Sequence, residues 1–189
     1  MRTSKKILIF LFSILILSCK YDQLGKSENT STELSNPFTP DYLKNNLRKD
    51  FPRLVLNSDI DKVLRKKLET DPIVKNIYQA IKTNADEVLQ KPLLERIKIG
   101  KRLLSVSREM LYRINMLGMV YHIDKDPKIL ERIDQEVKAV CKFSDWNPSH
   151  YLDVGEMSMA VAFALDWTAG ALPQSTIDLA MNALIENYH

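Results

Sequence analysis

The sequence predicts an all-α protein built from antiparallel helical hairpins, and three observations lead to this fold class. Apolar residues recur at spacings of three and four along most of the chain after residue 57, as they do on the buried face of a helix. Proline marks three helix starts, in Asp126-Pro127, Asn147-Pro148 and Leu172-Pro173. No segment alternates apolar and polar residues as a half-buried strand does, and no Asn-Gly hairpin turn occurs.

The first three helices are predicted between residues 58 and 121. Ser58 or Asp59 can cap a first helix that runs to Leu68. A third, long amphipathic helix runs from about Leu93, past Gly100, to residue 121. Between them, the second helix carries one inward-facing apolar stripe, formed by Ile73, Val74, Ile77, Tyr78, Ile81, Ala85, Val88 and Leu89.

Each of the remaining three helices follows one of the proline signals. The fourth begins at Asp126-Pro127, and the sixth follows Leu172-Pro173; both are amphipathic. The fifth follows Asn147-Pro148 and has no polar side after Ser158, so we expect it to be buried all round. The inward residues of the fourth helix are Ile129, Leu130, Ile133, Val137 and Val140.

Six helices with short connections are typical of a bundle, a helical-repeat solenoid or an α/α toroid. A helix without a polar face needs neighbours on both sides, and two or three flanking helices supply only part of that cover. The sequence also ends two residues after Asn187, directly at the end of a helix. We therefore expect residues 51–189 to be the first, truncated part of a larger helical domain.

Residues 1–18 have the pattern of an export signal. Arg2, Lys5 and Lys6 precede the apolar stretch 7–17, which is shorter than the roughly 20 residues that span a bilayer and suits the core of a secretion signal. The small residue Ser18 stands directly before Cys19, as in the cleavage box of bacterial lipoproteins. The pattern predicts lipidation of Cys19 and a protein anchored in the bacterial cell envelope, in the periplasm or at the outer membrane.

Residues 19–50 are predicted to be a polar tether, since they are rich in Ser, Thr and Asn and their apolar residues keep no period. The formal net charge is +3, but three of the 27 basic residues lie in the export signal, which leaves 24 basic and 24 acidic residues from Cys19 onwards. A neutral body without a basic stripe argues against a nucleic-acid partner.

The densest group of chemically useful side chains lies at residues 143–157, at the start of the fifth helix. Trp146, Asn147, His150 and Tyr151 are predicted to bind substrate. The two aromatic rings would flank the opening as sugar-stacking surfaces, with the amide and the imidazole between them.

An alternative interpretation of the same cluster is structural. Asn147 then only caps the helix, and Trp146 and Tyr151 belong to the core. Asp153 and Glu156 accept hydrogen bonds from backbone donors of neighbouring hairpins, because a buried carboxylate has to be satisfied.

The sequence offers little support for other chemistry. No metal site and no cofactor are predicted, because the histidine and carboxylates of residues 150–156 have no second histidine nearby. The triplet His122-x-Asp124-x-Asp126 is interpreted as a polar loop between helices. Cys141 lies among apolar residues and is predicted to be buried, and with Cys19 lipidated it has no disulfide partner in the chain. A catalytic triad and a phosphate-binding glycine loop are both absent from the sequence.

One stretch resembles a known family. Residues 145–153, Asp-Trp-Asn-Pro-Ser-His-Tyr-Leu-Asp, continued by Glu156-Met157, the alanine-rich segment 160–165 and Asp166-Trp167, are similar to the N-terminal toroid of heparinase II/III-like polysaccharide lyases. Residues 52–56 and 113–126 resemble the same region, so the likeness covers residues 51–187. The resemblance implies an α/α toroid in an exported enzyme that continues into a β-sandwich.

The resemblance also implies a reaction, the β-elimination of uronic-acid polysaccharides such as heparan sulfate or alginate. An amide or a cation neutralises the enolate that develops on the uronate, a His or Tyr removes the C5 proton, and a Tyr protonates the leaving oxygen. In the family these residues come mostly from later helices and the β-sandwich, so no catalytic residue is assigned and the chain alone is expected to be inactive. The alternative is a non-catalytic glycan-binding lipoprotein built from helical repeats.

Overall fold

The computed structural model describes residues 36–187. Within this range the chain forms seven α-helices and no strand, which confirms the all-α prediction. The export signal and Cys19 lie outside the described residues. No helix within residues 36–187 is long and apolar enough to cross a membrane. The helices are α2 (Pro40–Asn46), α3 (Ser58–Thr70), α4 (Pro72–Gln90), α5 (Leu104–Asp124), α6 (Pro127–Cys141), α7 (Tyr151–Trp167) and α8 (Gln174–Glu186).

The described residues divide into two units, of which the first ends at Leu47 and the second begins at Arg48. In the first unit the Thr39 side chain caps α2 by accepting a hydrogen bond from the Tyr42 N–H, and every described residue is exposed. The segment predicted as a polar tether, residues 19–50, therefore contains a short helix that its composition did not indicate.

In the second unit, polar side chains cap three helices as their sequences suggest. Asn57 Oδ1 accepts hydrogen bonds from the Asp59 and Ile60 N–H groups, so α3 is capped one residue earlier than predicted. Asp71 caps α4, and Asp126 caps α6, where Pro127 occupies the first turn. Such caps satisfy N–H groups that have no partner inside the helix.

Two predicted helix starts are wrong. The third helix does not pass through Gly100: α5 begins at Leu104, and residues 91–103 form a connection whose Gly100 has φ +61°. Left-handed backbone geometry is easy for glycine and incompatible with a helix. The fifth helix begins at Tyr151 instead of Pro148, because Asn147 has φ +63° and turns the chain before the helix starts.

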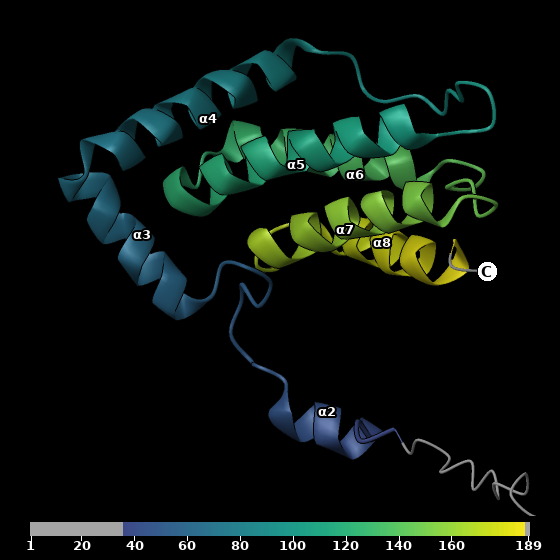
Figure 1. Ribbon diagram of the computed structural model, residues 1–189, viewed down its shortest axis with the longest axis horizontal. Helices are drawn as coiled ribbons and strands as arrows, with labels where there is room; N and C mark the ends of the chain where they lie inside the picture. The colour runs from purple at the N-terminus through teal and green to yellow at the C-terminus, as the bar shows by residue number, and fades with distance from the viewer. Residues whose placement is uncertain (1–35, 188–189) are drawn as a thin grey trace, which may run out of the picture. The chain divides into compact units, whose positions relative to one another are not determined.

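The hairpins α5–α6 and α7–α8 pack side by side, with α5 against α7 and α6 against α8 (Figure 1). The contact between α5 and α7 is close, since a Cβ on Gly118 would lie 2.8 Å from Cε3 of Trp167. A larger residue at this crossing would force the Trp167 ring or the helix to move. The fully buried side chains of this core include Met110, Ile114, Leu117, Ile133, Val137, Val140, Met157 and Val161.

Two predicted apolar faces are only partly covered within residues 48–187. On α4, Ala85 and Val88 are buried, but Ile73 and Ile77 near its start are 68% and 56% exposed. The expectation that α7 is buried all round is wrong, because Leu152 and Met159 are about half exposed.

Two polar clusters fix the connections to this core. The Asp166 carboxylate, at the end of α7, accepts hydrogen bonds from the Arg53 and Leu54 N–H groups and so holds the segment that precedes α3. The buried Glu136 of α6 accepts hydrogen bonds from Arg113 and Arg132, and these arginines also donate to the Leu89, Lys91 and Pro92 carbonyls. The start of the α4–α5 connection is thus fastened to two helices.

Candidate functional site

The cluster predicted from the sequence lies where two connections meet at one end of the helix pairs (Figure 1). Residues 91–103 lead from α4 into α5, and residues 142–150 lead from α6 into α7. The Asn147 side-chain amide donates a hydrogen bond of 2.9 Å to the Lys101 carbonyl, which joins the two connections directly. We call these two segments and the first two turns of α7 the loop junction.

Asp153 of α7 is the centre of the loop junction. Its side chain is completely buried, and its two oxygens accept four hydrogen bonds. Arg102 donates to Oδ1 from Nε at 3.1 Å and from Nη2 at 2.8 Å. The Leu103 N–H and the Asn147 amide donate to Oδ2, each at 2.7 Å. The structural interpretation of Asp153, as an acceptor for a backbone donor of a neighbouring hairpin, is confirmed.

Both aspartates of the loop junction are held in the charged form. Burial raises the pKa of Asp153, but its hydrogen bonds with Arg102, Asn147 and the Leu103 N–H outweigh this, so the pKa lies below its ordinary value. Asp145 behaves in the same way: burial raises its pKa, and hydrogen bonds from Arg96 and the Asn147 N–H lower it further than burial raises it.

The predicted substrate contacts of Trp146 and Asn147 are wrong, because neither side chain reaches the surface. The Trp146 ring has no exposed area, and its Nε1 donates to the Val140 carbonyl at 2.9 Å. Asn147 is 3% exposed, and its amide joins Lys101 to Asp153. The ring belongs to the core, as the alternative interpretation has it, while Asn147 is a bridge between connections and not a helix cap.

His150 and Tyr151 do reach the surface. Within residues 36–187, Tyr151 is the most exposed of the large apolar side chains, at 81%, which rules out the core position that the alternative gave it. His150 is half-buried, and its Nδ1 lies 3.0 Å from Ser149 Oγ. Of the four predicted substrate-binding residues, these two remain accessible to a ligand.

Two arginines of the site were not foreseen from the sequence. Arg102 pairs with Asp153, and Arg108 of α5 pairs with Glu156 of α7 at 3.2 Å. Their side chains are 39% and 61% exposed, so each guanidinium meets solvent as well as its carboxylate. One feature of the sequence indicated such arginines: Asp153 and Glu156 lie three residues apart on α7, and both carboxylates need partners on a neighbouring helix.

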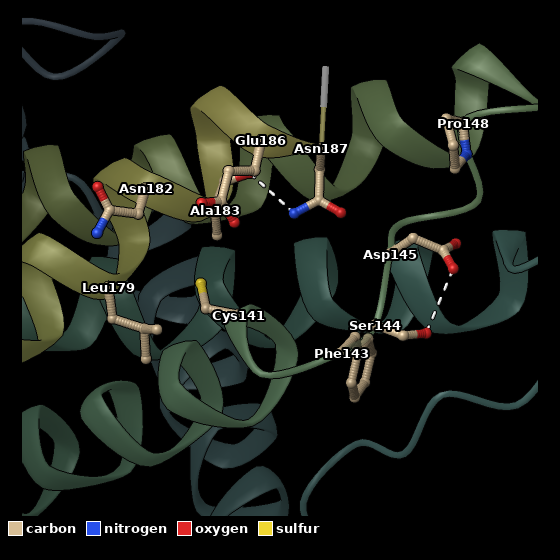
Figure 2. Close-up of a pocket in the computed structure, with 10 residues that line it drawn as sticks. All are labelled: Cys141, Phe143, Ser144, Asp145, Pro148, Leu179, Asn182, Ala183, Glu186 and Asn187. Atoms are coloured by element: carbon tan, nitrogen blue, oxygen red, sulfur yellow. Dashed lines mark hydrogen bonds between the residues drawn. The ribbon is translucent and has the colours of Figure 1, made fainter. Parts of the chain in front are cut away.

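A cavity of about 150 Å³ lies behind the loop junction, between the end of α6 and the last turns of α8 (Figure 2). Asn187 Oδ1 accepts a hydrogen bond from the Trp146 N–H here, while its amide donates to the Ala183 carbonyl. The predicted burial of Cys141 is confirmed, and this burial raises the pKa of its thiol to about 12. The cavity is lined by Cys141, Phe143, Ser144, Asp145, Pro148, Leu179, Asn182, Ala183, Glu186 and Asn187.

No group of histidines, cysteines and carboxylates within residues 36–187 is arranged to hold a metal ion. The segment of His122 and Asp124 is the last turn of α5, so the prediction of a loop there is wrong. His122 is buried, and its Nε2 lies 2.7 Å from Oδ1 of Asp61 on α3. No family model matches the chain, and no curated protein matches it in sequence.

Proposed function

We propose that this chain is the N-terminal toroid portion of an exported polysaccharide lyase that cleaves a uronic-acid-containing polysaccharide by β-elimination. The proposal places the chain in the heparinase II/III-like class, anchored in the cell envelope through lipid on Cys19. The loop junction forms part of the surface that holds the polymer, and the reacting groups belong to the rest of the enzyme.

The observation that carries the proposal is the position of the accessible residues. Tyr151 and His150 stand in the same short stretch on which the family resemblance rests, and Arg102 and Arg108 flank the first two turns of that helix. The exposed Tyr151 ring and the two partly exposed guanidinium groups are the kinds of group that bind a uronic-acid polymer. The ring stacks on a sugar face, and the guanidinium groups pair with uronate carboxylates.

The rigidity of the loop junction also supports a binding role. Asp153 and Asn147 join three segments through hydrogen bonds of 2.7–2.9 Å. A site that is already ordered loses little conformational entropy when a ligand binds. Because the two arginines are also tied to carboxylates on α7, part of their charge is already compensated, and binding of the polymer is expected to be weak and salt-sensitive.

The proposal is tested by incubating the full-length product of the gene with a panel of uronic-acid polymers. The expected result is an unsaturated uronate that absorbs in the near ultraviolet, with no product from a neutral glucan. An Arg108→Ala variant is expected to raise KM more than it lowers kcat, because Arg108 holds the polymer without taking part in proton transfer.

Two results would overturn the assignment. Binding of the polymers without any unsaturated product would favour the non-catalytic glycan-binding lipoprotein. The absence of both binding and product would leave only a structural helical domain.

A further inference from the structure

The connection between α4 and α5 exposes two aliphatic side chains to solvent. Ile97 is 58% exposed and Ile99 is 71% exposed, although each would gain roughly 1.5–3 kcal/mol if it were buried. The two isoleucines are separated by one residue, Lys98, in this connection. Exposed apolar groups that are bordered by charged residues are one mark of an interaction surface.

These isoleucines are held outward by a well-braced turn. The Ile99 N–H donates to the Arg102 carbonyl at 2.9 Å, and the Arg102 N–H donates back to the Ile99 carbonyl at 3.1 Å. Gly100, at φ +61°, permits this turn. Arg96 pairs with Asp145 at 2.6 Å, and Arg102 pairs with Asp153, so the turn is fixed on both sides. We call residues 96–102 the basic–apolar tip.

Cations alternate with the isoleucines along the tip. Lys98 and Lys101 are exposed, and neither forms an ion pair within residues 36–187. Glu95 is the one acid in the connection from 91 to 103. The aspartates that face the tip from the other connection and from α7 are each neutralised by an arginine. The tip therefore presents apolar groups with an uncompensated positive charge.

We propose that the basic–apolar tip docks onto the surface of an anionic lipid bilayer. Ile97 and Ile99 enter the interfacial layer, while Lys98 and Lys101 stay at the depth of the lipid phosphates. Amphipathic segments with basic polar groups bind membranes in this manner, through apolar area and attraction to anionic lipid together. A bilayer accepts two projecting isoleucines without a matching groove, which a folded protein partner would have to supply.

The test places an environment-sensitive fluorophore on the tip of the full chain. Ile99→Cys is labelled in a Cys19→Ser background, in which the buried Cys141 thiol stays unlabelled. The matched control is Ile77→Cys on α4, which is also exposed, at 56%. Both proteins carry the same N-terminal apolar segment, so any difference between the labelled positions comes from the tip.

With vesicles of phosphatidylcholine and phosphatidylglycerol, the label at position 99 is expected to shift to the blue and to be quenched by quenchers on the lipid chains. The label at position 77 is expected to do neither, and vesicles of phosphatidylcholine alone should give a much weaker response at position 99. Replacing both lysines, as Lys98→Glu with Lys101→Glu, is expected to lower the inserted fraction more than tenfold, since each lysine contributes about fivefold near an anionic surface.

Two outcomes would overturn the proposal. If positions 99 and 77 respond alike, insertion is not a property of the tip. If the response at position 99 does not depend on phosphatidylglycerol, the lysines do not recognise anionic lipid. The tip then either binds a protein partner or remains exposed to solvent.

Discussion

Replacing Asp153 with alanine removes the acceptor on which the loop junction converges. The change leaves the Leu103 N–H without its partner inside the protein, and Leu103 has no exposed area. It also frees the Asn147 amide from one of its acceptors and leaves Arg102 without its carboxylate. The connection from α4 to α5 would then be joined to α7 through far weaker contacts.

The expected cost follows from these three losses. A buried N–H left unsatisfied costs about 1–3 kcal/mol, and the hydrogen bond that Asn147 donates to the charged carboxylate contributes about 1.5–3 kcal/mol. The pair with Arg102 is counted at less than about 1 kcal/mol, because the Arg102 side chain is 39% exposed and solvent screens its charge. Together, Asp153→Ala is expected to lower the free energy of unfolding by about 2.5–7 kcal/mol at pH 7.

The assay is urea unfolding of the full chain, followed by helical circular dichroism at several pH values. The folded pKa of Asp153 lies below its ordinary value, so its stabilisation is complete above the ordinary pKa and is lost as the pH falls through the folded pKa. The difference between wild type and Asp153→Ala should therefore be constant near neutral pH and shrink below about pH 4. Asp178→Ala, at an exposed site on α8, is the control and should change stability by less than about 0.5 kcal/mol. A loss below about 1 kcal/mol, or a difference unchanged at pH 3, would refute the reasoning.

Three further changes test the packing by the same unfolding assay or by thiol labelling. Glu136→Gln leaves the buried Arg132 without its counter-charge and leaves Arg113 paired with Glu109 alone, and it should cost about 3 kcal/mol or more. A loss under about 1 kcal/mol would contradict the network. Gly118→Ala places a Cβ 2.8 Å from Trp167 and should destabilise the protein by about 1–3 kcal/mol. Gly155→Ala, whose added Cβ has nothing within 4 Å, should stabilise α7 by up to about 1 kcal/mol. Equal effects of the two variants on stability would rule out the close crossing of α5 and α7. Burial raises the pKa of Cys141 to about 12, so its thiol should resist alkylation at pH 8 in the folded chain and react once the chain is unfolded. Labelling followed by mass spectrometry measures this difference. Fast alkylation of the folded chain would disprove the burial of Cys141.

The helical class and most helix starts could be predicted because they depend on local chemistry. Asp126-Pro127 both caps and opens α6, and this signal needs no tertiary information. The start of α5 could not be predicted in the same way. Residues 93–103 have apolar spacing that a helix also shows, and their conformation is fixed by hydrogen bonds to Asp145, Asn147 and Asp153, which lie far away in the sequence.

The sequence predicted which residues gather at the start of α7, but only partly how each side chain is placed. The cluster at residues 145–156 does gather two connections, yet sequence chemistry does not distinguish a tryptophan that faces water from one that fills a core. Trp146 is buried because its Nε1 donates a hydrogen bond to the Val140 carbonyl on α6 and its ring packs within the core beneath the α6–α7 connection. Arg102 and Arg108 were missed because their relation to α7 is created by the packing of α5 on that helix.

The central proposal, that the loop junction holds an acidic polysaccharide, is tested most directly by the affinity of the chain for an oligouronate of defined length. Isothermal titration should give binding that weakens with salt and that falls about tenfold or more in Tyr151→Ala, because a stacked aromatic ring and its buried area are lost. Met181→Ala, about half exposed on α8, is the matched control and should bind as wild type does. Equal affinity of wild type and Tyr151→Ala, or equal binding of a neutral oligosaccharide, would contradict the proposal.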